Sequence, residues 1–191
     1  INLKDVFADF LRNQGDTSIC FGEQYLLENK SVGANSYFWD FGNGTTSTAK
    51  DVSEYGYSAP GTYTVSLSIK NIQFGCKDTV AKDIIVHPTP TAFAIGDTIC
   101  LGSDAFVYAV PSDTGLSYQW SPESILNPDT GLFSSGKFSS TTPVLLTVSN
   151  RYNCIDTSWT TVFVILPPNE IIFDTIVPLG STVILPFQPQ F

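Results

Sequence analysis

Residues 62–69 read TYTVSLSI, and this stretch decides the fold of the 191-residue chain. From Tyr63 to Ile69, apolar or aromatic side chains occupy every second position, with polar side chains between them. A period of two is typical of a strand with one buried face and one exposed face. Residues 144–148 and 161–165 have a similar character, and no stretch places apolar residues at helical spacing. The sequence therefore predicts an all-β fold.

The composition is that of a folded, acidic protein. Hydrophobic residues make up 42% of the chain, charged residues 14%, and the formal net charge is −9. That apolar fraction excludes disorder as the main state. An acidic chain without a cluster of cations binds polyanions poorly, so we expect no nucleic-acid partner. The apolar runs are far shorter than the ~20 residues of a membrane helix, so we expect no membrane insertion in this segment.

The chain repeats itself at an interval of about 80 residues. Three segments return with matching residues: 16–22 (DTSICFG) as 97–102 (DTICLG), 36–39 (SYFW) as 117–120 (SYQW), and 75–79 (GCKDT) as 153–157 (NCIDT). A further start at 173–180 (FDTIVPLG) has Val177 at the cysteine position. Repetition at this period is typical of small β-sandwiches joined in tandem.

The repeats predict four segments. We assign residues 1–7 to the tail of a preceding repeat and residues 168–191 to the start of a further one. Between them we expect one sandwich over 8–88 and a second over 89–167. The joints contain prolines, at Pro88 and Pro90 and again at 167–168, and proline stiffens a short linker.

Two motifs in the first repeat resemble the PKD domain family. Residues 39–47 read WDFGNGTTS and residues 57–65 read YSAPGTYTV, close to the family's WDFGDG and GxYxVxL patterns. Asn43 replaces the second aspartate of the first motif, and Tyr55 stands near the usual histidine. The resemblance covers roughly residues 8–88 and implies an Ig-like β-sandwich of the PKD type.

The second repeat resembles the Ig-like repeats of long Bacteroidetes surface proteins. The likeness rests on IC-G near its start, then Y-W-SP, then the asparagine and cysteine of residues 150–154. It implies tandem Ig-like sandwiches, arranged end to end, in a type IX-secreted cell-surface protein of the gliding-motility or adhesin kind. The implied function is that of a non-catalytic extracellular spacer and presentation scaffold. The alternative is an accessory carbohydrate- or protein-binding module of a secreted hydrolase.

We expect no catalytic residue and no cofactor. His87 is the only histidine, and it lies between Val86 and Pro88 in a joint, with no nucleophile spaced to meet it. The carboxylates are scattered over separate repeats, which leaves little room for the paired acids of a glycosidase. Residues 40–44 (DFGNG) could offer oxygen ligands to Ca²⁺, but too few for a cage of ~6–8 oxygens, so we expect no metal site.

Aromatic residues and three threonines are the remaining candidates. Trp39 and Trp120 occupy matching repeat positions, and we interpret both, together with Tyr63, as core residues rather than a sugar platform. We extend the core interpretation to Trp159. Three Asp-Thr-aliphatic triplets resemble the O-glycosylation motif of exported Bacteroidetes proteins, with ordinary strand starts as the alternative. They contain Thr79, Thr98 and Thr175.

The four cysteines suggest disulfides, and four allow three pairings. Cys20 precedes the expected strand 24–31, whereas Cys76 follows the expected strand 62–71. In an Ig-type sandwich these strands run in the same direction, so the two cysteines lie at opposite ends, roughly 25 Å apart at ~3.3 Å per residue. A disulfide needs Cα atoms within ~7 Å. We therefore predict an inter-repeat bond from Cys20 to Cys154.

The same placement assigns Cys76 and Cys100 to cysteines of the neighbouring repeats of the same chain. Pairing within each repeat is the alternative, and it requires a segment to fold back over the sandwich. Beyond neighbouring repeats, the expected partners are a surface polysaccharide or a protein ligand.

Overall fold

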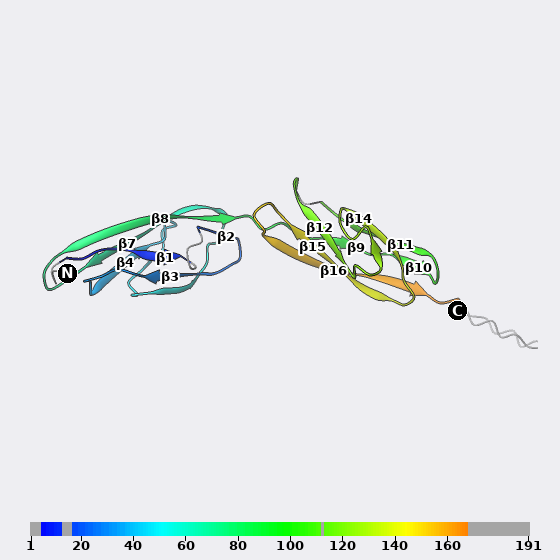
Figure 1. The fold of residues 1–191 in the computed structure, drawn as a ribbon, viewed down its shortest axis with the longest axis horizontal. Helices are drawn as coiled ribbons and strands as arrows, with labels where there is room; N and C mark the ends of the chain where they lie inside the picture. Colours follow the sequence, from blue (N-terminus) through cyan, green and yellow to red (C-terminus); the bar gives the residue numbers. More distant parts are fainter. Residues whose placement is uncertain (1–4, 13–16, 112, 168–191) are drawn as a thin grey trace, which may run out of the picture.

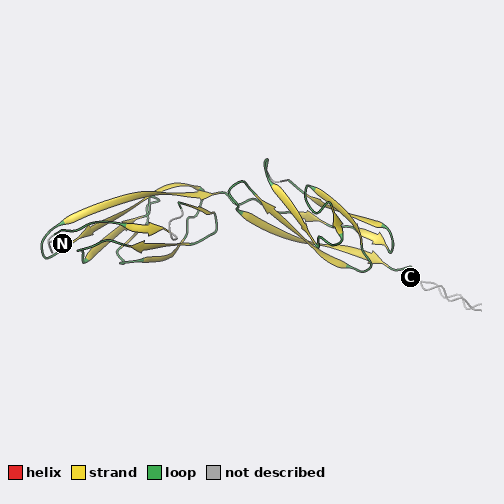
Figure 2. Cartoon of the chain, viewed as in Figure 1, coloured by secondary structure: helices red, strands yellow, loops and turns green. Residues whose placement is uncertain are grey.

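The computed structural model describes residues 5–12, 17–111 and 113–167. Within these ranges every regular element is a β-strand, and the strands form two sandwiches placed end to end (Figures 1 and 2). The expected all-β fold is confirmed. No helix in the described part has the length and apolar character needed to cross a membrane. The segment assigned to a further repeat, 168–191, and its Thr175 lie outside the described residues.

The first sandwich packs a three-stranded sheet, ordered β1-β3-β6, against a five-stranded sheet, ordered β2-β8-β7-β4-β5. Its strands are β1 Phe10–Arg12, β2 Ser18–Cys20, β3 Tyr25–Asn29, β4 Ser36–Asp40, β5 Thr46–Ser47, β6 Val52–Tyr55, β7 Gly61–Lys70 and β8 Lys77–His87. The stretch that decides the fold is β7, and its alternating residues Val65, Leu67 and Ile69 are buried. Strand β2 pairs in parallel with the end of β8, where Cys20 lies opposite His87.

The second sandwich repeats this plan with two four-stranded sheets, ordered β10-β16-β15-β12 and β13-β14-β11-β9. Its strands are β9 Ala94–Ile95, β10 Thr98–Cys100, β11 Asp104–Ala109, β12 Ser117–Ser121, β13 Leu126–Asn127, β14 Phe133–Lys137, β15 Thr142–Ser149 and β16 Ile155–Ile165. Strand β10 pairs in parallel with the end of β16, so Cys100 lies opposite Ile165. The end of the first sandwich that carries Cys20 therefore corresponds to the end of the second sandwich that carries Cys100.

Each sandwich has its own core around one tryptophan. Trp39 on β4 and Trp120 on β12 are both fully buried, at equivalent positions of the two repeats. Tyr63 is half-buried and packs at the edge of the first core, where its ring stacks on Tyr57 at 3.8 Å and its hydroxyl donates to the Ala59 carbonyl.

Two expectations need correction. The first sandwich begins before residue 8, because Phe7 pairs with Val32 through two backbone hydrogen bonds and Val6 packs against the core. Residues 5–7 thus belong to the first sandwich rather than to a preceding repeat. Trp159 is 67% exposed and is not a core residue, because its position on β16 faces away from the opposing sheet.

Candidate functional site

The joint between the sandwiches is closed by a disulfide. Cys20 ends β2 of the first sandwich, and Cys154 immediately precedes β16 of the second. Their Cα atoms are 5.5 Å apart, within the range that a disulfide requires. This is the inter-repeat pair that the strand placement predicts. Cys76 and Cys100 are free in the structure, so their assignment to cysteines of neighbouring repeats stays a prediction.

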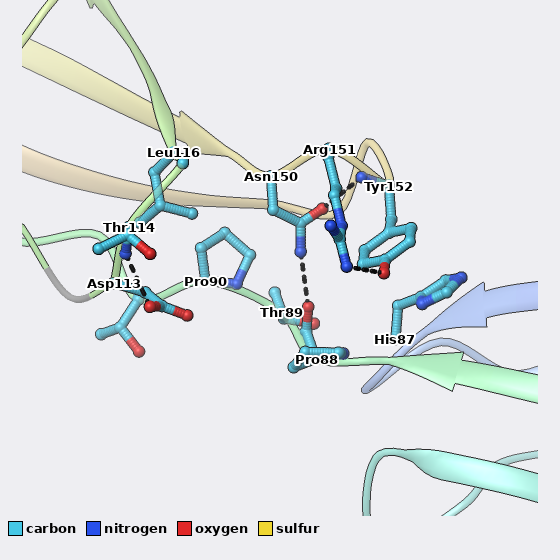
Figure 3. Close-up of a pocket in the computed structure, with 12 residues that line it drawn as sticks. His87, Pro88, Thr89, Pro90, Asp113, Thr114, Leu116, Asn150, Arg151 and Tyr152 are labelled. Carbon is cyan, nitrogen blue, oxygen red and sulfur yellow. Dashed lines mark hydrogen bonds between the residues drawn. The ribbon is translucent and has the colours of Figure 1, made fainter.

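Ring contacts and hydrogen bonds surround the disulfide. The His87 ring stacks on the Tyr152 ring with centroids 3.7 Å apart and planes only 8° from parallel. The Arg151 guanidinium lies over the same tyrosine ring, 4.7 Å from its centroid, and donates a hydrogen bond to the tyrosine hydroxyl. Figure 3 shows His87 reaching Tyr152 from the end of the first sandwich. The only histidine of the chain therefore serves as a contact surface for the next sandwich.

The linker between the sandwiches is held on both sides. The Asn150 side-chain amide donates to the Pro88 carbonyl at 2.8 Å, as Figure 3 shows. The Thr89 hydroxyl donates to the Phe21 carbonyl at 2.6 Å. Each sandwich thus hydrogen-bonds to the linker within two residues of where β8 ends, so linker and disulfide together restrict the angle between the sandwiches.

A groove of about 640 Å³ lies beside this linker. Residues 87–91, 113–116 and 150–152 line it, and Asp113 and His87 lie at opposite ends of it in Figure 3. The Asp113 carboxylate accepts the Thr114 backbone N–H at 2.7 Å, and the His87 ring is covered by Tyr152. The groove therefore brings together no acid, base and nucleophile in hydrogen-bond contact, which catalysis of the triad type requires.

Two side-chain oxygen atoms of the 40–44 loop accept hydrogen bonds from residues close in sequence. Asp40 accepts the Gly42 N–H at 2.9 Å, and the Asn43 side-chain oxygen accepts the Thr45 hydroxyl at 2.7 Å. The Asn43 amide also donates to the Tyr55 hydroxyl at 2.8 Å. The two residues that depart from the PKD pattern therefore bond to each other. Among the described residues, no three His, Cys, Asp or Glu side chains are grouped so that they could hold a metal ion.

The described candidate glycosylation threonines, Thr79 and Thr98, are exposed at strand positions. The Thr79 hydroxyl lies 3.0 Å from the Ser68 hydroxyl. The neighbouring aspartates have a structural role, because Asp78 accepts the Ala8 N–H at 2.7 Å and Asp156 of the equivalent segment accepts the Ala92 N–H at 2.8 Å. Each repeat thus uses this aspartate to hold its first segment against the rest of its sandwich.

The second sandwich carries an exposed apolar surface that none of the sequence motifs predicts. Tyr108 on β11 lies opposite Ile95 on β9 and Phe133 on β14, so the three side chains form a row across the sheet. We call the outer surface of these strands the aromatic face. It consists of Phe93, Ile95, Phe106, Tyr108, Val110 and Phe133, each at least 44% exposed. Residues 105–110 are apolar at every position, so both faces of this strand are apolar. That pattern is the sequence feature that indicates an exposed apolar face.

Two strand-built sandwiches, each with one buried tryptophan at the same place, define a tandem of immunoglobulin-like β-sandwich modules. Residues 12–86 match the PKD domain family. The chain therefore belongs to the PKD domain family through its first sandwich.

Several solved structures are similar to parts of this chain. The PKD1 domain from the Vibrio cholerae metalloprotease PrtV is 31% identical over 42% of this chain and 94% of that one, with a TM-score of 0.34. The PKD1 domain of Vibrio anguillarum Epp is 28% identical over 44% of this chain and 94% of that one, with a TM-score of 0.35. Fibronectin(III)-like modules of Clostridium thermocellum CbhA are 8% identical over 85% and 95% of the two chains, with a TM-score of 0.39. Among curated proteins, no sequence matches this chain.

Proposed function

We propose that this chain is a non-catalytic part of a bacterial cell-surface protein, where it acts as an extracellular spacer and presentation scaffold, as in adhesins of the gliding-motility and type IX-secreted kind. The observation that carries the proposal is the joint, in which a disulfide, a ring stack and two hydrogen bonds to the linker connect consecutive sandwiches. Disulfide bonds persist in oxidising compartments, which is consistent with an extracellular location.

The geometry of the joint supports a role in holding modules at a fixed angle. The two sandwiches follow one another along the long axis of the molecule (Figure 1). Domains joined by a linker alone move relative to each other by default. The Cys20–Cys154 bond is a second covalent connection beside the linker, and it restricts this motion. The second sandwich is therefore held at a set distance and angle from the first.

The proposal is tested by solution scattering on the double variant Cys20→Ser/Cys154→Ser. We expect both sandwiches to stay folded while the mean radius of gyration falls, because a released joint samples bent arrangements in addition to the extended one. The matched control is Cys76→Ser/Cys100→Ser, which leaves the joint intact. An unchanged scattering profile in the first variant would show that the disulfide does not set the angle.

Antibody labelling of intact cells tests the surface location.

The aromatic face favours a second candidate, an accessory module that binds polysaccharide or protein. Exposed apolar patches of this kind are uncommon on soluble proteins and mark binding surfaces. Flat aromatic rings stack on the C–H faces of sugar rings, so an insoluble neutral polysaccharide is the first probe. Retention of the chain should disappear in Tyr108→Ala/Phe133→Ala and persist in the control Phe38→Ala, an exposed aromatic of the other sandwich. Equal retention of all three proteins would exclude this face as the binding surface.

A further inference from the structure

The closed joint consists of two complementary halves, one from each sandwich. We call the β15–β16 turn of the second sandwich the plug; Tyr152 and Cys154 contact the first sandwich, and Asn150 holds the linker. We call the β2–β3 turn of the first sandwich, with the end of β8, the socket; Cys20 and His87 contact the second sandwich, and Phe21 holds the linker. The disulfide and the ring stack join plug to socket. Because the chain is repetitive, each sandwich also carries a copy of the other half.

The first sandwich carries an open plug in its β7–β8 turn. Asn71 begins this turn, and its side-chain oxygen accepts the Gln73 N–H at 3.1 Å, as the Asn150 side-chain oxygen accepts the Tyr152 N–H at 2.9 Å. The turn from Asn71 to Cys76 is one residue longer than the turn from Asn150 to Cys154. In both turns the aromatic residue stands two positions before the cysteine. Phe74 is 45% exposed, and Cys76 is half-buried and forms no disulfide in the described part of the chain.

The second sandwich carries an open socket at its opposite end. The Leu101 N–H donates to the Ile165 carbonyl at 3.0 Å, just as the Phe21 N–H donates to the His87 carbonyl at 2.7 Å. Cys100 lies opposite Ile165 in the strand register, as Cys20 lies opposite His87. Cys100 is exposed, and Leu101 and Ile165 add apolar surface beside it.

We propose that the open plug of one copy of this module docks into the open socket of a second copy and forms a Cys76–Cys100 bond there. The inference rests on the proposed spacer function and names the partner: a second module of this same kind, met end to end. Phe74 takes the place of Tyr152 and packs on Ile165 and Leu101 in place of the histidine ring. The start of β8 and the end of β16 lie at opposite ends of the molecule (Figure 1), so the contact is head to tail and extends the array without closing it.

The bond forms by thiol–disulfide exchange. The Cys76 and Cys100 thiols together lose two electrons and two protons, and a low-molecular-weight disulfide is reduced to two thiols in return. Oxidised glutathione therefore supplies the oxidant in the test. The Cys20–Cys154 bond needs no change during this step.

The test incubates the full chain with glutathione in both redox states and maps the new disulfides between copies. Random pairing of two equally reactive thiols gives mixed and like bonds in equal amounts. We expect Cys76–Cys100 bonds to exceed like bonds by about tenfold or more, which corresponds to a docking preference of at least ~1.4 kcal/mol. A ladder of covalent dimers, trimers and longer species should form, because each added copy leaves one open plug and one open socket.

Single-cysteine variants give the decisive comparison. Cys76→Ser alone and Cys100→Ser alone should each stay monomeric, whereas an equal mixture of the two should stop at dimers. Phe74→Ser should slow mixed-bond formation, while Ile72→Ser, a change of an exposed apolar residue in the same turn, serves as its control. Like-with-like dimers at the same rate, or no bonds between copies, would overturn the inference. Neither outcome touches the Cys20–Cys154 scattering test, so the two proposals fail independently.

Discussion

At the scale of single residues, the two core tryptophans perform the same task in the two repeats. The Trp39 indole N–H donates to the Ala49 carbonyl at 3.0 Å, and the Trp120 indole N–H donates to the Gly131 carbonyl at 3.0 Å. Each ring fills its core and also holds a loop, the β5–β6 connection in the first sandwich and the β13–β14 connection in the second. In the first sandwich the ring packs edge-on against Phe10, with centroids 5.1 Å apart.

Trp39→Ala should reduce the free energy of unfolding by ~3–5 kcal/mol, because it empties a large buried site. It also leaves the Ala49 carbonyl without its indole donor. Chemical denaturation followed by circular dichroism measures the loss. Trp159→Ala is the matched control and should change stability by less than about 0.5 kcal/mol, as expected for an exposed residue. A loss below about 1 kcal/mol at Trp39 would contradict its role as the centre of the core.

The sequence indicates the core tryptophans but not the orientation of Trp159. The segment containing Trp120 alternates clearly, and the repeat aligns Trp39 with it, although residues 37–39 are three consecutive aromatic residues. Residues 162–165 are apolar at four consecutive positions, so the phase of β16 is ambiguous. Trp159 points outward because the opposing sheet covers the other face of β16. Which face is covered depends on the tertiary structure and not on the local sequence.

At the scale of elements, an ion pair ties the segment around β1 to β8. The Lys82 ammonium lies 2.7 Å from the Asp9 carboxylate, and the same ammonium donates to the Phe10 carbonyl and lies over the Phe10 ring. The hydrogen bond from Lys82 lowers the pKa of the Asp9 carboxyl below its ordinary value of 3.8. Strand β1 belongs to one sheet and β8 to the other, so this pair connects the two layers.

The depressed pKa of Asp9 makes part of the stability dependent on pH. Since the pKa is lower in the folded state, the contribution is fully present above the ordinary carboxyl pKa and is lost as pH falls through the folded-state value. Asp9→Asn should therefore lower the melting temperature at neutral pH, and the difference from the unmodified chain should shrink below about pH 4. Melting curves across this range measure it, with the exposed Glu54→Gln as control. A difference that stays constant with pH would show that the ion pair does not stabilise the fold.

Local sequence predicts the elements better than the contacts between sandwiches. Alternation and the repeat are enough to place β7 and β15. The cysteines before β3 and after β7 lie at opposite ends of strands that run in the same direction, and this is enough to predict the Cys20–Cys154 pair. The stack of His87 on Tyr152 could not be predicted, because it depends on the angle between two bodies and not on any local pattern. The aromatic face could not be predicted for a similar reason. Both faces of β11 are apolar, and the sequence alone does not indicate which face the opposing sheet covers.

At the scale of the whole molecule, the disulfide encloses most of the chain between its two ends. A load applied to both ends of the polypeptide passes through the sulfur atoms and bypasses the 134 residues that separate the two cysteines. At ~3.3–3.6 Å per extended residue, the bond withholds on the order of 450 Å of length from a pulled chain. Single-molecule pulling should therefore extend the whole sequence of the reduced chain, but only residues 1–19 and 155–191 of the oxidised one. With the bond intact the tether lengthens only through these two arms, and a reductant makes the enclosed sequence extensible as well.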